Sequence, residues 1–182
     1  MTRDQAIKLI RKYVKNENLV KHMIATGVVM KHLARHFNEN EAMWEIAGLL
    51  HDIDYERTKD NPQKHGIVSL DILKEEGIED EDIYSAILAH CGKKERETLM
   101  EKCIYAADPV TGFIVACALM HPTKSLKGLD LGFLKRRFKE KRFAKGASRE
   151  QMKSIEETGL SLDEFLDLSL KSMQEISEEL GL

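Results

Sequence analysis

The sequence has little of what marks secreted or membrane proteins. Among its 182 residues are only three cysteines, Cys91, Cys103 and Cys117, which form no Cys-X-X-Cys pair. A disulfide framework is therefore not expected, and the thiols fit buried, inert positions in a reducing compartment. No stretch approaches 18 uncharged apolar residues, and the highly charged N-terminus lacks a signal-peptide core. We therefore expect a cytoplasmic protein without membrane association.

A large excess of charge of one sign is also missing. The formal net charge is -3, from 28 basic and 31 acidic residues, which excludes a surface adapted as a whole to nucleic acid. Segment 124–145 is the exception, because it holds nine Lys or Arg residues against two acidic ones. This segment fits a solvated helix face or a surface for an anionic ligand. A nucleic-acid partner is disfavoured, since aromatic residues make up only 6% of the chain and no known reading motif is present.

Proline is scarce, and sustained alternation of apolar and polar residues is absent. Apolar residues recur instead at spacings of three and four, and helix-start signals repeat along the chain. We therefore predict an all-α fold, formed as one domain over 1–182, with a core at about 18–120 and a basic C-terminal helical extension at about 124–182. The predicted helices are 3–16, 18–37, 40–52, 62–76, 80–91, 95–107, 109–120, 130–141, 148–157 and 162–180. The apolar face of the last helix fits core packing or a dimer interface, which leaves a homo-oligomer open.

Histidines and aspartates stand at the margins of the apolar helix faces. They are His22, the adjacent His51 and Asp52, His65, His90 and Asp108. His51 and Asp52 directly follow an almost wholly apolar run, where an unpaired carboxylate would cost several kcal/mol. Taken singly, each residue has an ordinary explanation: a core histidine, a surface histidine, or in Asp108 a cap for a helix that begins at Pro109. Taken together, they match a metal site inside a helical bundle.

A second histidine pair, His32 and His36, has the spacing of a surface metal site. The helical wheel places both outside the apolar face that runs through Leu19, Met23 and Met30. We therefore interpret this pair as facing water rather than as a metal site.

The order of these residues resembles the HD superfamily of metal-dependent phosphohydrolases, which is named for the adjacent His-Asp pair. The resemblance includes GLLHDIDY at the end of an apolar helix, an upstream histidine on the preceding helix and the closing YAADPVTG. It covers about residues 18–120, and the tail looks like the extension of small stand-alone members. The Gly-Tyr-Pro signature of the branch that cleaves cyclic dinucleotides is absent.

The resemblance implies a helical bundle that holds divalent metal. In the family, the positions of His22, His51, Asp52 and Asp108 hold one ion, and those of His65 and His90 allow a second, with Asp52 as the carboxylate that could bridge them. Nitrogen and oxygen ligands suit iron, manganese, cobalt, nickel, zinc or magnesium. By analogy we expect two ions, with iron or manganese favoured.

The resemblance also implies hydrolysis of a small phosphorylated substrate, expected to be a nucleotide, by a metal-bound hydroxide. Candidates for catalysis are Asp52 and His65, with Lys64 and Lys93 at the phosphate. Candidates for substrate binding are Lys94, Arg137 and Arg142. Alternative functions are a non-catalytic HD-type regulator that binds metal or nucleotide, a nucleic-acid-binding module and an iron-dependent oxygenase of a related branch.

Overall fold

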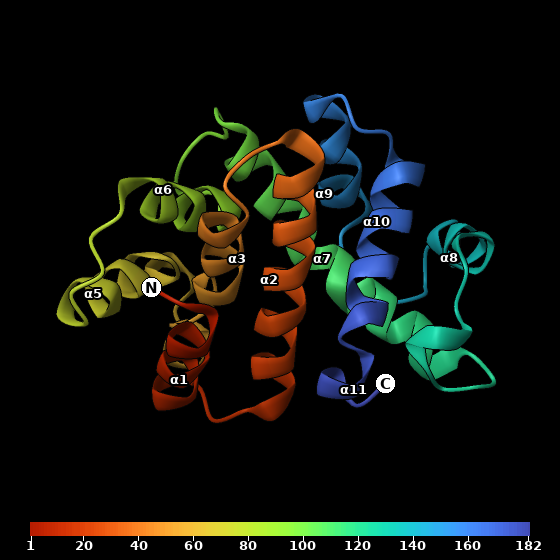
Figure 1. Cartoon of the computed structure of the whole chain (residues 1–182), viewed down its shortest axis with the longest axis horizontal. Helices are drawn as coiled ribbons and strands as arrows, with labels where there is room; N and C mark the ends of the chain where they lie inside the picture. The colour runs from red at the N-terminus through yellow and green to blue at the C-terminus, as the bar shows by residue number, and fades with distance from the viewer.

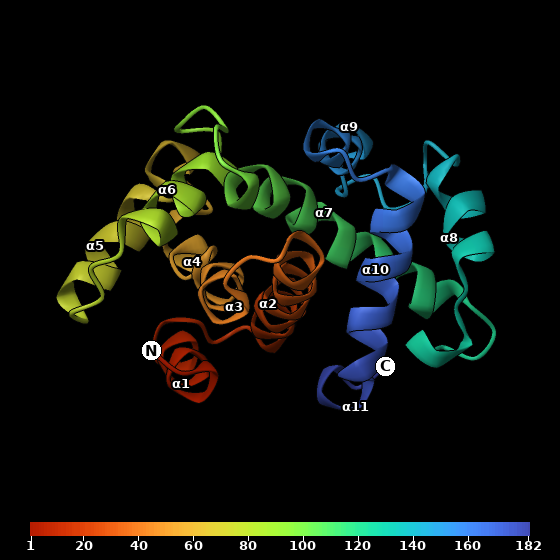
Figure 2. The ribbon, with the colours of Figure 1, turned by 45° about the horizontal axis from the view of Figure 1, so that its top comes forward.

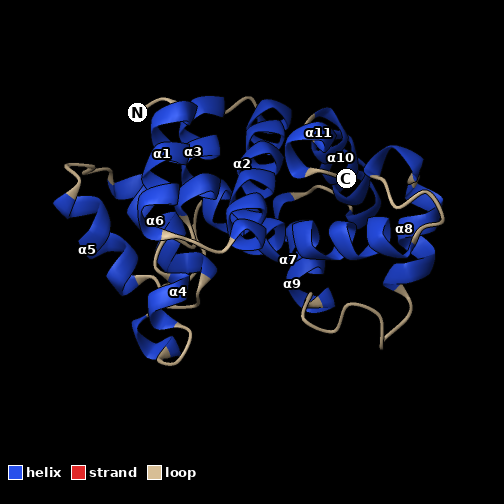
Figure 3. Ribbon diagram, turned by 90° about the horizontal axis from the view of Figure 1, so that it is seen from below, coloured by secondary structure: helices blue, strands red, loops and turns tan.

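The computed structural model of the protein describes all 182 residues and contains helices and turns but no strand (Figures 1 and 3). The all-α prediction is therefore confirmed. The helices are α1 (Arg3–Tyr13), α2 (Glu17–Phe37), α3 (Glu41–Leu50), α4 (Tyr55–Thr58), α5 (Ile67–Glu75), α6 (Glu81–His90), α7 (Leu99–Met120), α8 (Leu131–Phe138), α9 (Arg149–Lys153), α10 (Leu162–Glu175) and α11 (Ser177–Leu180). Short 3₁₀ turns are η1 (Pro62–Lys64), η2 (Leu126–Gly128) and η3 (Ser154–Thr158).

The long helix α7 joins the two halves of the molecule (Figures 1 and 2). Its first half packs against α6, its middle against α2, and its second half against α8, α9 and η3. The helix is long and apolar enough to cross a membrane by length and composition, although it contains charged residues, among them Asp108. Because 61% of its most apolar window is buried inside the protein, the central position of α7 in the core accounts for its apolar composition.

The prediction of two helices, 95–107 and 109–120, is wrong, because α7 continues without a break through Pro109. A proline inside a helix removes one backbone hydrogen bond and costs about 3 kcal/mol. The residues on both sides of it compensate, since Ile104 and Ala107 before it and Val110 and Ile114 after it are buried in the same core. Asp108 therefore lies in mid-helix and does not cap a helix that begins at Pro109.

Other helix boundaries also differ from the prediction. Residues 62–76 form η1 followed by α5, the polar segment 54–61 contains α4, and the last predicted helix divides into α10 and α11. In the basic helix α8, Leu134 is buried and Phe138 packs against Phe113. Cys103 and Cys117 are buried, whereas Cys91 is only half-buried, and all three thiols are free.

A close approach of α2 and α3 sets the positions of the first site residues. A Cβ atom on Gly48 of α3 would lie 2.8 Å from the carbonyl oxygen of Thr26 and 2.9 Å from the Cα of Gly27. Any larger residue at position 48 would push the helices apart. The contact therefore brings His22 of α2 next to His51, which directly follows α3.

A continuous cluster of 46 buried apolar residues runs from Ala6 in α1 to Leu180 in α11. The C-terminal helix α10 contributes Phe165, Leu170 and Met173 to it and packs on α2 and α7. The apolar face of this helix is thus used for core packing within the chain.

Glu101 ties the start of α7 to its surroundings. Its carboxylate accepts hydrogen bonds from Ser85 Oγ at 2.5 Å, from the backbone N–H groups of Glu97 and Thr98 at 2.6 and 2.9 Å, and from Lys94 Nζ at 2.9 Å. Burial alone would raise the pKa of Glu101, but these hydrogen bonds outweigh it and lower the pKa to about 2. The charged form of Glu101 is therefore the one that the fold stabilises.

We expect Glu101→Gln to destabilise the protein by on the order of 2 kcal/mol at neutral pH. Because the folded-state pKa is depressed, this contribution is full above the unfolded value near 4.5 and is lost as the pH falls toward about 2. Urea unfolding between pH 7 and 2.5 measures it. Glu97→Gln, at an exposed position, is the control, and identical acid profiles for wild type and Glu101→Gln would contradict the prediction.

Candidate metal centre

Six side chains that are far apart in the sequence meet where five segments of the chain converge. His22 comes from α2, His51 and Asp52 follow α3, His65 stands between η1 and α5, His90 ends α6 and Asp108 lies in α7. They form two groups, His22, His51, Asp52 and Asp108 in one and Asp52, His65 and His90 in the other, whose potential ligand atoms lie within 4.8 Å of one another. The structure thus brings together all six residues predicted from the sequence.

Asp52 belongs to both groups and faces each with a different oxygen. Its Oδ2 lies 3.6 Å from His22 Nε2 and 3.5 Å from His51 Nε2. Its Oδ1 lies 3.4 Å from the Nε2 atoms of both His65 and His90. A carboxylate with one oxygen in each group has the geometry of a bridge between two cation sites.

The second carboxylate of the cluster is that of Asp108, which belongs to the first group only. Its Oδ1 is 3.1 Å from His22 Nε2 and 3.8 Å from His51 Nε2.

All four imidazoles are held through Nδ1, which leaves Nε2 directed at the cluster. His51 Nδ1 is 2.7 Å from the carbonyl oxygen of Gly48, and His90 Nδ1 is 2.5 Å from that of Ile87. A carbonyl oxygen only accepts, so Nδ1 carries a proton in both rings and Nε2 is the nitrogen left for a metal ion. Histidines that bind metal are usually held in this way by a hydrogen bond from the other ring nitrogen.

The other two histidines are held by side chains. His65 Nδ1 is 2.8 Å from Asp54 Oδ1, and His22 Nδ1 is 2.9 Å from Thr111 Oγ1. The Thr111 hydroxyl donates its proton to the carbonyl oxygen of Asp108 at 3.0 Å, so it accepts from His22. The Nε2 atoms of these two residues therefore also face the cluster as potential metal ligands.

The donor set fits divalent metal ions. His90 Nε2 is buried and makes no hydrogen bond, although an unsatisfied buried polar atom is costly. Ligands bound about 2.1 Å from one ion lie roughly 3.0–3.4 Å apart in octahedral or tetrahedral geometry. Most nitrogen–oxygen separations in the two groups are close to this, at 3.1–3.6 Å. Imidazoles and carboxylates without thiolates suit iron, manganese, zinc and their neighbours.

Strong electrostatic coupling accompanies this geometry. Burial alone would lower the pKa of His51, but Asp52 and Asp108 outweigh it and raise the pKa to about 9. Burial alone would raise the pKa of Asp52, but His51 and His90 bring it down to about 2. The carboxylates thus hold positive charge on the neighbouring imidazoles, and a metal ion that bound there would displace those protons.

Asp54 is fully buried and contacts the second group through His65. Besides His65, its carboxylate accepts hydrogen bonds from the backbone N–H groups of Gly66 at 2.8 Å and Ser69 at 3.0 Å. Asp54 thus fixes both the ring of His65 and the start of α5. This agrees with the position of Asp54 two residues after the His-Asp pair.

We expect Asp54→Asn to lower the affinity for metal by roughly 10- to 100-fold, because His65 loses the carboxylate that orients it and raises its basicity. Competition with a chelator, followed by elemental analysis, measures the affinity. Asp60→Asn is the matched control at an exposed position. Equal metal affinity in Asp54→Asn and Asp60→Asn would contradict this role.

The structure places the candidate cations around the cluster rather than in contact with it. Lys94 is held by Glu101 and Glu97 at 2.9 and 3.0 Å, and Lys93 Nζ lies 3.3 Å from Gln63 Oε1. Lys64 is exposed and makes no ion pair. Their contact with substrate stays a prediction.

The two arginines of the basic extension also make no contact with the six residues. Arg137 pairs with Glu140 at 2.9 Å and stacks on Phe133 and Phe143. Arg142 is exposed and unpaired. Substrate binding by Arg137 and Arg142 stays a prediction.

His32 and His36 lie apart from the cluster and have different neighbours. His32 is half-buried rather than facing water as we expected, because its Nε2 lies 3.1 Å from Glu175 Oε2 of α10. His36 is exposed and packs edge-on against Phe37.

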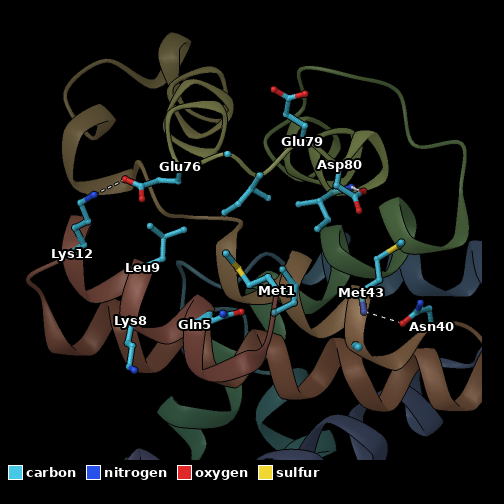
Figure 4. A pocket seen from close by; sticks show the side chains of 15 residues that line it. Met1, Gln5, Lys8, Leu9, Lys12, Asn40, Met43, Glu76, Glu79 and Asp80 are labelled. Carbon is cyan, nitrogen blue, oxygen red and sulfur yellow. Dashed lines mark hydrogen bonds and ion pairs between the residues drawn. The ribbon is translucent and has the colours of Figure 1, made fainter.

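Two surface pockets include residues of the cluster, and a third, larger pocket does not. One of about 380 Å³ lies between α2, α7 and the C-terminal residues and includes His22, and another of about 380 Å³ lies between α7 and segment 144–147 and includes His22 and Asp108. The largest, about 830 Å³, lies between α1, the start of α3 and the α5–α6 turn (Figure 4). It contains none of the six residues.

Thr111 and Gly112 are the site residues that the sequence analysis missed. Thr111 holds the ring of His22, and Gly112 lies in both pockets that reach the cluster. The signal was present in YAADPVTG, since Thr111 and Gly112 follow Asp108 by three and four residues. On an uninterrupted helix that spacing places them on the same face as the aspartate.

Comparison with known proteins gives matches in the same region. A family model described as HD domain matches residues 19–111, about half of the chain. Ribonucleases Y of Fusobacterium nucleatum subsp. nucleatum and Desulforudis audaxviator are each 30% identical over 95 residues, which are 52% of this chain and 18% of each relative. The chain thus spans less than a fifth of their length.

The match to a further relative covers most of that protein's length. The symmetrical bis(5′-nucleosyl)-tetraphosphatase of Bacillus subtilis is 25% identical over 150 residues, covering 71% of this chain and 75% of the relative. No solved structure matches the chain.

Proposed function

The chain belongs to the HD domain family, and from that premise we propose that it is a metal-dependent phosphohydrolase. Its substrate is a nucleotide or another small phosphate ester or anhydride. The observation that carries the proposal is the common orientation of the four histidines, each held through Nδ1 with Nε2 directed at one shared carboxylate, Asp52. Such an arrangement is built to bind cations rather than to pack a core.

The relatives support a nucleotide as substrate. A ribonuclease and a bis(5′-nucleosyl)-tetraphosphatase both act, by their names, on nucleotide compounds. The symmetrical tetraphosphatase is matched over most of its length, so it is the better guide to a small substrate.

Different residues of the chain would bind the metal ions and orient the imidazoles. His22, His51, Asp52 and Asp108 would hold one ion, and Asp52, His65 and His90 a second. When bound, the two ions neutralise phosphate charge and lower the pKa of water so that a nucleophile is available near neutral pH. Asp54 and Thr111 keep two of the imidazoles in the orientation that binding requires. The pockets beside His22 and Asp108 admit substrate from the exposed side of the cluster.

A hydrolysis screen with manganese- or iron-loaded protein tests the proposal. The panel consists of nucleoside mono-, di- and triphosphates and dinucleoside polyphosphates, with phosphate and nucleotide release as readouts. Release that requires metal and disappears in Asp108→Ala supports the proposal. Metal and nucleotide binding without turnover of any member would favour the regulatory alternative instead.

A further inference from the structure

Gly112 occupies an unusual position on α7, one turn after Asp108. It is exposed, and a Cβ atom built on it would meet no other atom within 4 Å. Glycine weakens a helix interior relative to alanine, so nothing in the local structure favours it here. Gly112 lines both pockets that reach the metal centre. The missing side chain therefore leaves open space on the surface of α7 beside both pockets, which we interpret as a passage between them.

The pocket on the α2 side has an apolar part next to polar residues, which include Asn18, Lys21 and Thr111. Its walls include Ala25 of α2, Val115 and Leu119 of α7, and Leu180 and Leu182 at the C-terminus. Its volume of about 380 Å³ falls in the range of small-molecule sites. A planar or apolar group of about the size of a nucleobase fits this chemistry.

The pocket on the other side is bounded by small residues of a basic loop. Ala144, Gly146 and Ala147 form the wall opposite His22 and Asp108. The same loop carries Lys141, Arg142 and Lys145, which are exposed and make no ion pair. Because small residues line this wall and the same loop supplies three cations, an anionic group is favoured on this side of the metal centre.

Arg149 fixes the basic loop in place. Its guanidinium donates hydrogen bonds to five backbone carbonyl oxygens, those of Arg137, Phe138, Phe143, Ala144 and Ala147, at 2.8–3.4 Å. It also lies over the ring of Phe113, 4.7 Å from its centroid. The loop is thus tied to α7 and held at the edge of the pocket.

We propose that the substrate lies across Gly112. Its phosphate reaches the metal centre beside the basic loop, and its organic group occupies the apolar pocket against Val115 and Leu182. This inference rests on the proposed function and narrows its substrate class to phosphate esters or anhydrides with one planar or apolar group of nucleobase size. Gly112 is the specificity-determining position, because any longer side chain would fill the passage.

Binding of a probe that cannot be hydrolysed tests this arrangement. The probe is the phosphonate analogue of AMP, in which carbon replaces the ester oxygen, titrated calorimetrically into manganese-loaded protein. We expect Gly112→Leu to weaken binding at least tenfold, while metal content stays the same and the melting temperature does not fall. Gly132→Leu is the matched control, since Gly132 is an exposed helical glycine that lines none of the three pockets.

A second pair of titrations separates the two ends of the site. Replacing Arg142 and Lys145 together with alanine should weaken both the AMP analogue and inorganic phosphate about tenfold. Val115→Thr should weaken the AMP analogue alone. Unchanged affinity of Gly112→Leu for the AMP analogue would overturn the inference, as would failure of the wild-type protein to bind that analogue at millimolar concentration. Neither result depends on turnover, so a failure of the proposed hydrolase activity is detected independently.

Discussion

Asp52→Ala is expected to remove the metal and to reduce hydrolysis by roughly a thousandfold or more. Asp52 is the one residue shared by both groups, with Oδ2 directed at His22 and His51 and Oδ1 directed at His65 and His90. Its loss therefore leaves the second group without any carboxylate and the first group with Asp108 alone. No neighbouring carboxylate can replace it in the second group, because Asp108 faces only His22 and His51.

Metal content and turnover of the variant should be measured on the same preparation, after purification without chelators. His32→Ala is the matched control, since His32 pairs with Glu175 away from the cluster, and we expect it to retain both metal and activity. Retention of two ions per chain in Asp52→Ala would refute the bridging role. Retention of one ion would show that the first and second groups bind metal independently.

The candidate site was largely predictable because it includes polar side chains that directly follow apolar stretches of sequence. His51 and Asp52 end an almost apolar run, and a charged group at such a point needs a partner or a cation. The family resemblance then added the order of His22, His65, His90 and Asp108. The cluster in the structure contains these six residues.

What the sequence could not supply was the direction of each side chain. Pro109 was interpreted as a helix start from its local preference, but the tertiary contacts of Val110 and Ile114 kept α7 intact. Because a helix boundary was expected at Pro109, the sequence analysis did not place Thr111 and Gly112 on the same helix face as Asp108, on which their roles depend. Lys94 was equally ambiguous, since its proximity to His90 in the sequence does not reveal that Glu101 holds it from the next helix.

Removing the metal from the wild-type protein should lower its melting temperature by about 8–16 °C. An ion present at about a thousand times its dissociation constant stabilises the fold by about 4 kcal/mol, and each kcal/mol corresponds to about 2–4 °C for a chain of this size. The structure supplies the reason for a loss of this order. Without an ion, His90 Nε2 is buried with no hydrogen bond, and Asp52 and Asp108 oppose each other's charge.

Calorimetric melting before and after chelation, and again after manganese is restored, measures this contribution. The wild-type protein should lose and regain the full shift together with its activity, because the same ligands stabilise the fold and form the site. Asp52→Ala should melt at the same temperature with and without chelator, since it has no ion to lose. A wild-type melting temperature that chelation leaves unchanged would mean that the cluster is satisfied by protons alone, as the raised pKa of His51 allows. The four imidazoles would then have only a structural role in the fold and would not bind metal.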